Sequence, residues 1–253
     1  MDAISVSQLN LYRACSLKYR FQYIDKIPKL FKSSGLAFGS AMHSAIEWLH
    51  KERLEGRDIT VDELVKMFAA DWYSQKLGIE IRIKDGESED ELAQRAKTLL
   101  GLYYEKGPKN ATHTELPFRV SLVDVSTGEV LDVPLIGYID LVEGDEILDE
   151  IKTSASAMDI ESLDTQFQLL AYAYAFEVTF KRSPKAIKLI DLVKTKKPRI
   201  EITEVEKLGR AQRWFFHTTK EAIRGIREGV FFPNPSFRCK ECEYQKQCGA
   251  WPL

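Results

Sequence analysis

The chain has 253 residues, of which 44% are hydrophobic and 29% charged, and its formal net charge is −2. This composition is typical of a folded globular protein and excludes a disordered or fibrous chain. No apolar run approaches the length of a membrane span, and the N-terminus lacks a signal-peptide pattern, so we expect a cytoplasmic protein. The near-neutral charge excludes a uniformly basic nucleic-acid coat. It is compatible with an enzyme whose acidic site meets phosphate through bound metal.

The first 110 residues show helical periodicity, with apolar side chains recurring three and four positions apart. Ser7 is the expected N-cap of the first helical region, and the second helix should end near Gly56. The polar stretch 84–90 should form a loop. The predicted helical segments are residues 5–26, 37–56, 61–77 and 88–106.

The period changes after residue 110, where β-branched and aromatic residues alternate with turn signals at 126–128 and 144–145. Three successive strands here predict an antiparallel meander, followed by helix, strand, strand and helix. The predicted segments are strands 115–124, 130–142 and 146–153, helix 163–180, strands 185–194 and 199–205, and helix 207–229.

This order of elements predicts an α/β (α+β mixed) class, with a central mixed sheet flanked by helices. We expect a single domain. Its parts are a mainly helical region (1–110), a core (111–230) and a C-terminal cysteine segment (231–253) that packs near residue 15.

Two carboxylates and a lysine follow each other across the predicted hairpin: Asp140 ends an apolar run, and Glu150 and Lys152 lie on the next strand. Because side chains alternate along a strand, Glu150 and Lys152 share a face. A two-residue loop would pair Asp140 with Asp149, whereas a loop of three or five residues would put Asp140 and Glu150 on one face. The sequence leaves the register open, and we favour Glu150 because it stands two residues from a lysine.

Such oxygen ligands suit Mg²⁺ or Mn²⁺, which lowers the pKa of bound water and stabilises charge on phosphoryl oxygens. Lys152 would then position or activate the attacking water, or neutralise the developing charge. An ordinary exposed hairpin carrying Asp, Glu and Lys is the competing interpretation.

Three motifs in order resemble the PD-(D/E)XK nuclease superfamily in its RecB-like exonuclease branch: Gly137-x-x-Asp140, Glu150-x-Lys152-Thr153 and Gln168-x-x-x-Tyr172. That branch also carries a histidine on an early helix, and Phe38-Gly-Ser-Ala-Met-His43 is similar to it. The resemblance implies a restriction-endonuclease-like core of a helix, three antiparallel strands, a helix and a further strand.

The resemblance also implies roles for individual residues. His43, Asp140, Glu150 and the Ile151 carbonyl would bind the metal, and Lys152 would be the catalytic lysine. Gln168 and Tyr172, one turn apart on a helix, would contact DNA or order the site.

Several further residues have two interpretations. Glu115, at the start of the first strand, is either another acidic member of the site or a surface residue. Lys194 is expected to be a solvated strand end more than a contact to the phosphate backbone. Aromatic residues near the N-terminus are expected to pack in the core more than to stack on bases; they are Tyr12, Tyr19, Phe21 and Tyr23.

The four cysteines favour metal binding over disulfides, because three of them crowd the last fifteen residues of a chain expected in the cytoplasm. Four thiolates can hold a 4Fe–4S cluster or a zinc ion, and their spacing does not separate the two. The resemblance implies the cluster, as in RecB-like recombination subunits and CRISPR-associated adaptation nucleases, with zinc as the alternative. The ligands would be Cys15, Cys239, Cys242 and Cys248.

The expected function is therefore that of a Mg²⁺- or Mn²⁺-dependent DNA nuclease, which the resemblance places on single strands or DNA ends in recombination, repair or CRISPR adaptation. The chain has no GxxxxGK[ST] loop, so a helicase activity would come from a partner protein. The alternatives are a catalytically silent nucleic-acid-binding or scaffold protein of the same fold, and a zinc-stapled interaction module.

Overall fold

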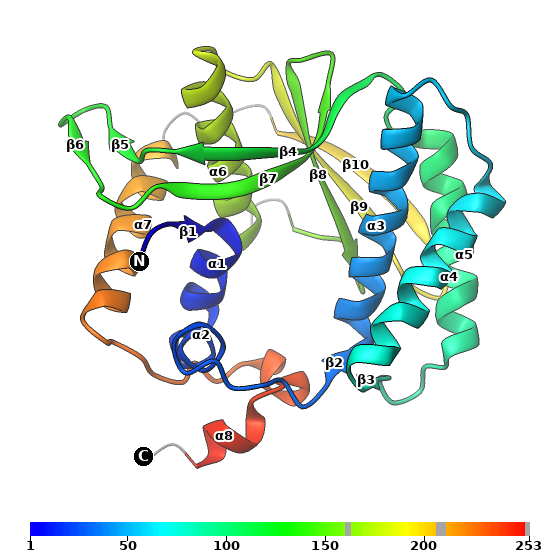
Figure 1. Ribbon diagram of the computed structural model, residues 1–253, viewed down its shortest axis with the longest axis horizontal. Coiled ribbons are helices and arrows are strands. Elements are labelled where there is room, and N and C mark those ends of the chain that lie inside the picture. The colour runs from blue at the N-terminus through cyan, green and yellow to red at the C-terminus, as the bar shows by residue number, and fades with distance from the viewer. Residues whose placement is uncertain (160–162, 206–210, 251–253) are drawn as a thin grey trace.

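A computed structural model describes residues 1–159, 163–205 and 211–250, and places helices on both faces of one six-stranded mixed sheet (Figure 1). β4 pairs antiparallel with β7, β7 with β8, and β9 with β10, whereas β8 and β9 run parallel. The predicted antiparallel meander and mixed sheet are thus confirmed. The sheet strands are β1 (Ile4–Ser5), β4 (Ala111–Val120), β7 (Leu135–Glu143), β8 (Ile147–Ser154), β9 (Ala186–Val193) and β10 (Arg199–Val205).

The pairing of β7 leaves part of one edge open. β4 covers the other edge along the whole strand, from Leu135 to Glu143. On the open side β1 pairs only with Leu135 and Ile136, and β8 pairs only from Leu141 onward. Within the described residues, positions 137–140 therefore have no strand beside them on that edge. This opening positions the candidate site.

The helices fall into two groups, each of which packs on one face of the sheet and buries a separate hydrophobic cluster. α3 (Ser34–Leu54), α4 (Val61–Gly78) and α5 (Glu89–Lys106) cover one face. α1 (Val6–Ala14), α6 (Leu163–Phe180) and α7 (Ala211–Arg227) cover the other. Side chains alternate along β8, so Leu148 joins the α6 side and Ile151 the α3 side.

Local capping explains where the helices begin. Ser5, not the predicted Ser7, caps α1, because Ser5 and Gln8 bond to each other's backbone N–H groups in a capping box. Ser88 and Glu91 form the same motif at α5. The second predicted helix begins at Ser34 rather than residue 37, because Ser33 supplies its cap.

Two predicted segments are divided in the structure. The helical region 5–26 breaks at Cys15, whose backbone is extended, into α1, α2 (Ser16–Tyr19) and the π-helix η1 (Arg20–Ile24). The predicted first strand begins earlier, at Ala111, and ends at Val120. Its last residues form a separate small hairpin, β5 (Val123–Asp124) with β6 (Glu129–Val130), because Asp124 caps the turn through Ser126.

The second predicted strand starts at Leu135, after Pro134, which has no N–H to donate to a neighbouring strand. Residues 207–210 of the last predicted helix lie outside the described residues. Short elements that the sequence pattern did not predict are β2 (Lys32–Ser33), β3 (Ile81–Arg82), η2 (Phe237–Glu241) and α8 (Gln245–Gly249). Across the described ranges, no helix combines the length and apolarity needed to cross a membrane.

His50 is a buried titratable group in the core between α3 and α5. It is 1% exposed, and its Nε2 shares a 2.8 Å hydrogen bond with the Tyr103 hydroxyl. Burial lowers the pKa of His50 to about 4, with a further contribution from Arg53. The unfolded chain therefore takes up this proton at a higher pH than the folded chain does.

We expect acidification to weaken the fold through His50. The stabilising effect of a depressed histidine pKa is complete above about pH 6.5 and is lost as pH falls toward 4, on the order of 3 kcal/mol for this group. Denaturant unfolding of wild type and His50→Gln across this pH range measures the effect. The variant should show the shallower dependence on pH; parallel curves would contradict the assignment.

Candidate metal-binding active site

The hairpin between β7 and β8 has the register that brings Asp140 to Glu150. Glu143 pairs with Ile147 and Leu141 with Asp149, so the loop consists of residues 144–146. Gly144 and Asp145 adopt positive φ angles of 52° and 63° in this turn. On the side of Leu141 away from the loop, β7 and β8 separate. There the Ile151 N–H donates to Asp140 Oδ2 at 2.8 Å instead of to the backbone of β7. The Asp140 carboxylate therefore lies at the point where the two strands part.

Asp140, Glu150 and Lys152 converge at this point, as their order in the sequence predicts. The Glu150 side chain is 2% exposed and contacts the Lys152 ammonium. Burial and then the charge of Glu150 raise the pKa of Asp140 well above its usual value. Burial lowers the pKa of Lys152, but Glu150 and Asp140 outweigh it, so the net shift is upward. If both acids were ionised, the site would hold more negative charge than its one lysine balances, and the raised pKa of Asp140 reflects this.

His43 joins these acids from α3. Its Nδ1 lies 4.0 Å from Asp140 Oδ2. Burial first, and Lys152 next, lower the pKa of His43, and a hydrogen bond to the Ile151 backbone raises it. The net shift is downward and favours the neutral imidazole, which is the form that binds metal. The Ile151 backbone therefore lies beside both His43 and Asp140.

Glu115 completes a group that the sequence motifs left incomplete. One ligand atom each from His43, Glu115 and Asp140 all lie within 4.8 Å of one another, the one such trio that the described residues contain. Thr114 pairs with Leu141 and Leu116 with Ile139, so Glu115 stands opposite Asp140. From the sequence, Glu115 could equally be a site residue or a surface residue. The reason is that the residue facing it on β7 depends on the strand register.

The backbone at Glu115 is unusual. Its φ is +48°, a left-handed conformation that costs a non-glycine residue free energy and that strands rarely contain. Burial, then Glu47 and Glu150, raise the pKa of the Glu115 carboxyl. Two partly buried carboxylates that face each other repel when both are ionised, and a cation between them would offset this repulsion.

α6 contributes Gln168 and Tyr172 to the same site. Gln168 Nε2 donates to the Tyr172 hydroxyl at 3.1 Å, and that hydroxyl donates to Asp140 Oδ1 at 3.5 Å. The Tyr172 ring meets Phe118 edge-on, with centroids 6.3 Å apart. Phe118 lies opposite Gly137 across β4 and β7. Gly137 is thus linked to Asp140 through two aromatic rings.

Asp149, the alternative partner for Asp140, is fully buried on the opposite face of β8. Burial and then Glu143 raise its pKa to about 8, while Lys188 opposes the shift. Lys188 also bonds Glu143 at 2.7 Å. Because side chains alternate along β8, Asp149 lies on the opposite face of the strand from Glu150 and Lys152.

The remaining expectations have mixed outcomes. Lys194 is half-buried rather than solvated: its Nζ lies 5.0 Å from the Phe38 ring centroid, and it lines a hollow with Lys84 and Arg95. Tyr19 and Phe21 are core residues, 2% and 6% exposed, as expected.

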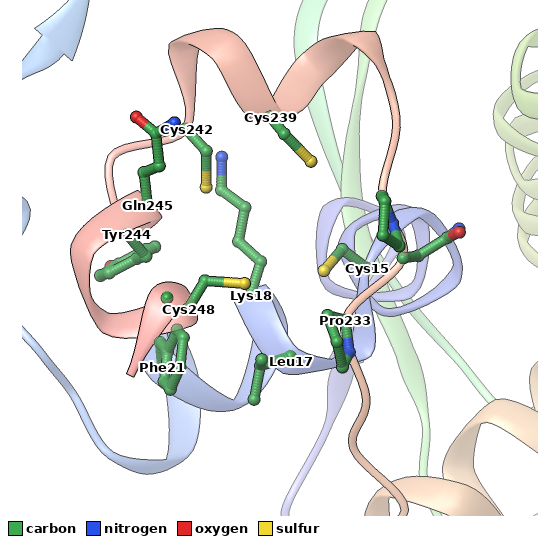
Figure 2. A pocket seen from close by; sticks show the side chains of 13 residues that line it. Cys15, Leu17, Lys18, Phe21, Pro233, Cys239, Cys242, Tyr244, Gln245 and Cys248 are labelled. Carbon is green, nitrogen blue, oxygen red and sulfur yellow. The ribbon is translucent and has the colours of Figure 1, made fainter. Parts of the chain in front are cut away.

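The four cysteines lie around one cavity of about 240 Å³ between the N-terminal and C-terminal segments, and their sulfur atoms face it (Figure 2). Cys15, Cys242 and Cys248 pack against a small apolar cluster of Leu17, Phe21 and Tyr244. The Ser16 hydroxyl donates to the Phe232 carbonyl at 3.1 Å and accepts from its N–H at 2.9 Å. These contacts bring residues near 15 against residues 231–248.

Gly137 provides a test of how the site is held. A Cβ at this position would lie 2.5 Å from the Phe118 ring, far inside ordinary contact distance. Gly137→Ala should therefore displace Phe118 from Tyr172 and destabilise the protein by about 1–3 kcal/mol in denaturant unfolding. Gly39→Ala is the matched control, because its Cβ would meet nothing within 4 Å inside α3, and it should stabilise by up to about 1 kcal/mol. Equal stability of Gly137→Ala and wild type would contradict this account.

Comparisons with known proteins agree with this geometry. The "Gene 69 protein" of Mycobacterium phage D29 is 26% identical over 96% of this chain and 95% of its own length. A crystal structure of an exonuclease candidate from Eubacterium rectale has the same fold, with a TM-score of 0.63 at 14% identity, over all of this chain and 89% of that one. The sequence matches the family model of the PD-(D/E)XK nuclease superfamily over residues 3–249. Because this match covers nearly the whole chain, the protein belongs to the PD-(D/E)XK nuclease superfamily.

Proposed function

We propose that the protein is a Mg²⁺- or Mn²⁺-dependent deoxyribonuclease whose reaction takes place at Asp140, Glu150 and Lys152. The observation that carries the proposal is the convergence of Asp140, the buried Glu150 and Lys152 where β7 and β8 separate. Membership of a nuclease superfamily makes the protein a hydrolase acting on nucleic acid. The metal, the choice of DNA and the roles of single residues are the parts proposed.

The donor set fits a hard divalent cation. Both carboxylate oxygens of Glu150 are buried, and the Lys152 ammonium contacts one of them. Asp140, Glu115 and Glu150 are oxygen ligands, which Mg²⁺ and Mn²⁺ prefer. His43 and the Ile151 carbonyl would complete the set. A bound cation would activate water and offset the charge that makes these acids costly to bury.

The protein's own groups then have distinct tasks. Lys152, held protonated by Glu150 and Asp140, would neutralise charge on the phosphoryl oxygens or position the attacking water. Tyr172 and Gln168 would hold the Asp140 carboxylate in place through their hydrogen bonds. Both would also stand where a bound strand passes, since they line the hollow that opens beside Asp140.

Cleavage assays test the proposal directly. Wild type with Mn²⁺ should degrade DNA labelled at either end, and a chelator should stop it. Lys152→Ala should slow cleavage by at least about 100-fold, because it removes the positive charge beside the phosphate. Lys185→Ala is the matched control, since Lys185 is an exposed lysine, and should cleave like wild type.

Calorimetric titration of Mn²⁺ into wild type and Asp140→Asn separates metal binding from chemistry. The variant should bind the ion more weakly, whereas Lys152→Ala should retain it. Failure of clean, metal-replete wild type to cut any single- or double-stranded DNA would falsify the enzyme proposal. It would favour a nucleic-acid-binding or scaffold role for the same fold.

We further propose that the enzyme acts as an exonuclease on single strands or DNA ends. The support is the resemblance of the motifs to the RecB-like branch and the likeness of fold to the Eubacterium rectale protein. Recombination, repair or CRISPR adaptation, with a helicase or other partner protein, is the setting proposed. Comparing DNA labelled at its 5′ end with DNA labelled at its 3′ end gives the polarity.

The four cysteines are proposed to hold a 4Fe–4S cluster that fastens the C-terminal segment to α2. Around a zinc ion, thiolate sulfurs stand roughly 3.8 Å apart, since Zn–S bonds are about 2.3 Å. Among the described residues, no three of these sulfurs lie within 4.8 Å of one another. The cavity of about 240 Å³ between them suits a larger group than a single ion.

Anaerobically purified protein should therefore be brown, with a broad visible absorbance and bound iron. Cys15→Ala should lose the colour and unfold at lower temperature, because the cluster closes a loop of most of the chain. Colourless protein carrying one zinc ion per chain would rule out the cluster and leave the nuclease proposal untouched.

A further inference from the structure

A hollow of about 530 Å³ opens directly beside Asp140 on the open edge of β7. β4, β7, α1 and α6 all contribute to its walls. Gln168 and Tyr172 line it from α6, and Ser7 lines it from the start of α1. Its floor is the stretch of β7 that has no strand beside it, between the pairings with β1 and β8. A ligand that reaches Asp140 from this side must pass through the hollow.

Tyr138 is an exposed aromatic residue that lines this hollow. It is 59% exposed, although it lies in a sheet strand in which the next residue, Ile139, and Leu141 further along are buried. Because side chains alternate, Tyr138 projects to the same side of β7 as Asp140, about 7 Å along the strand. Pro117 stands opposite it on β4 and also lines the hollow.

Tyr138 is not needed for packing. It belongs to neither large hydrophobic cluster and makes no ring–ring contact with another described aromatic side chain. Other exposed aromatic residues, such as Tyr73 at 63%, lie away from the hollow. An exposed ring therefore stands beside a candidate metal ligand, in a space that holds more than a water molecule.

We infer that this hollow is a nucleotide subsite, in which the base next to the scissile phosphate stacks on Tyr138. The inference rests on the proposed nuclease function and names the form of its substrate. The distance from Tyr138 to Asp140 matches the reach from a nucleotide's phosphate to its base. Base–aromatic stacking tolerates any sequence, because every base has a π-face.

This arrangement selects unpaired DNA. In a duplex both faces of a base are covered by its stacked neighbours, so an aromatic platform is accessible only to a base in a single strand or a frayed end. Polar groups at the edge of the hollow, Ser7 and Gln168, lie where they can meet the edge of a base or the sugar. The subsite therefore discriminates by strand state rather than by sequence.

Binding without cleavage tests the subsite. In the Lys152→Ala protein, with Mn²⁺ present, fluorescence anisotropy measures affinity for a labelled single strand and for the matching blunt duplex. Adding Tyr138→Ala should weaken single-strand binding by about 5- to 150-fold, the effect of losing one stacked base. Tyr138→Phe should bind within about twofold of the parent, because it keeps the ring.

Two controls distinguish stacking from a general effect. Tyr73→Ala removes a tyrosine of similar exposure on α4 and should leave the affinity unchanged. The dependence of affinity on salt should be the same with and without Tyr138, since no phosphate contact is removed. Unchanged single-strand affinity in Tyr138→Ala, or an equal loss for the duplex, would overturn the inference.

The outcomes separate the subsite from the chemistry. Cleavage by wild type together with an unchanged affinity of Tyr138→Ala would leave a nuclease without this subsite. Loss of single-strand affinity in Tyr138→Ala, together with a wild type that cuts nothing, would leave a single-strand binding site without the nuclease reaction.

Discussion

The structure depends on two carboxylates, the buried Glu150 and the partly buried Asp140, lying close together where two strands part. Burial and the neighbouring Glu150 carboxylate raise the pKa of Asp140 well above its usual value. One lysine and one backbone N–H offset only part of this repulsion. The divalent cation that we propose for this site would offset the rest.

The surrounding elements hold these acids in place from several directions. The three-residue hairpin sets the register, α3 supplies His43, and α6 supplies Tyr172. Gly137 has no side chain because the Phe118 ring occupies that space, and Phe118 in turn supports Tyr172. Conformational strain at Glu115 belongs to the same arrangement. Such strain is typical of functional sites, where the rest of the fold over-determines an unfavourable backbone.

The open edge of β7 gives this buried charge a route to substrate. Had β1 or β8 paired along all of β7, Asp140 would be sealed within the sheet. The short pairings at either end instead leave room for a hollow beside the carboxylate, with Tyr138 on its wall. The cysteine cavity lies between α2 and the last described segment, so residues from near both ends of the chain line it (Figure 2). The cysteine cavity and the open edge of β7 are therefore formed by different parts of the molecule.

Local patterns in the sequence determined the order of elements, the bounds of α6 and the lysine two residues beyond Glu150, because periodicity and strand alternation act over a few residues. The same periodicity placed the start of the helix 88–106 within one residue of α5. These local patterns did not determine the strand register. A shift of one residue in the hairpin would place Asp149 instead of Glu150 beside Asp140. Glu115 and Tyr138 depend on that register and on which edge of β7 stays open. Only the tertiary structure decides these, because contacts between distant strands set them and no local periodicity records them.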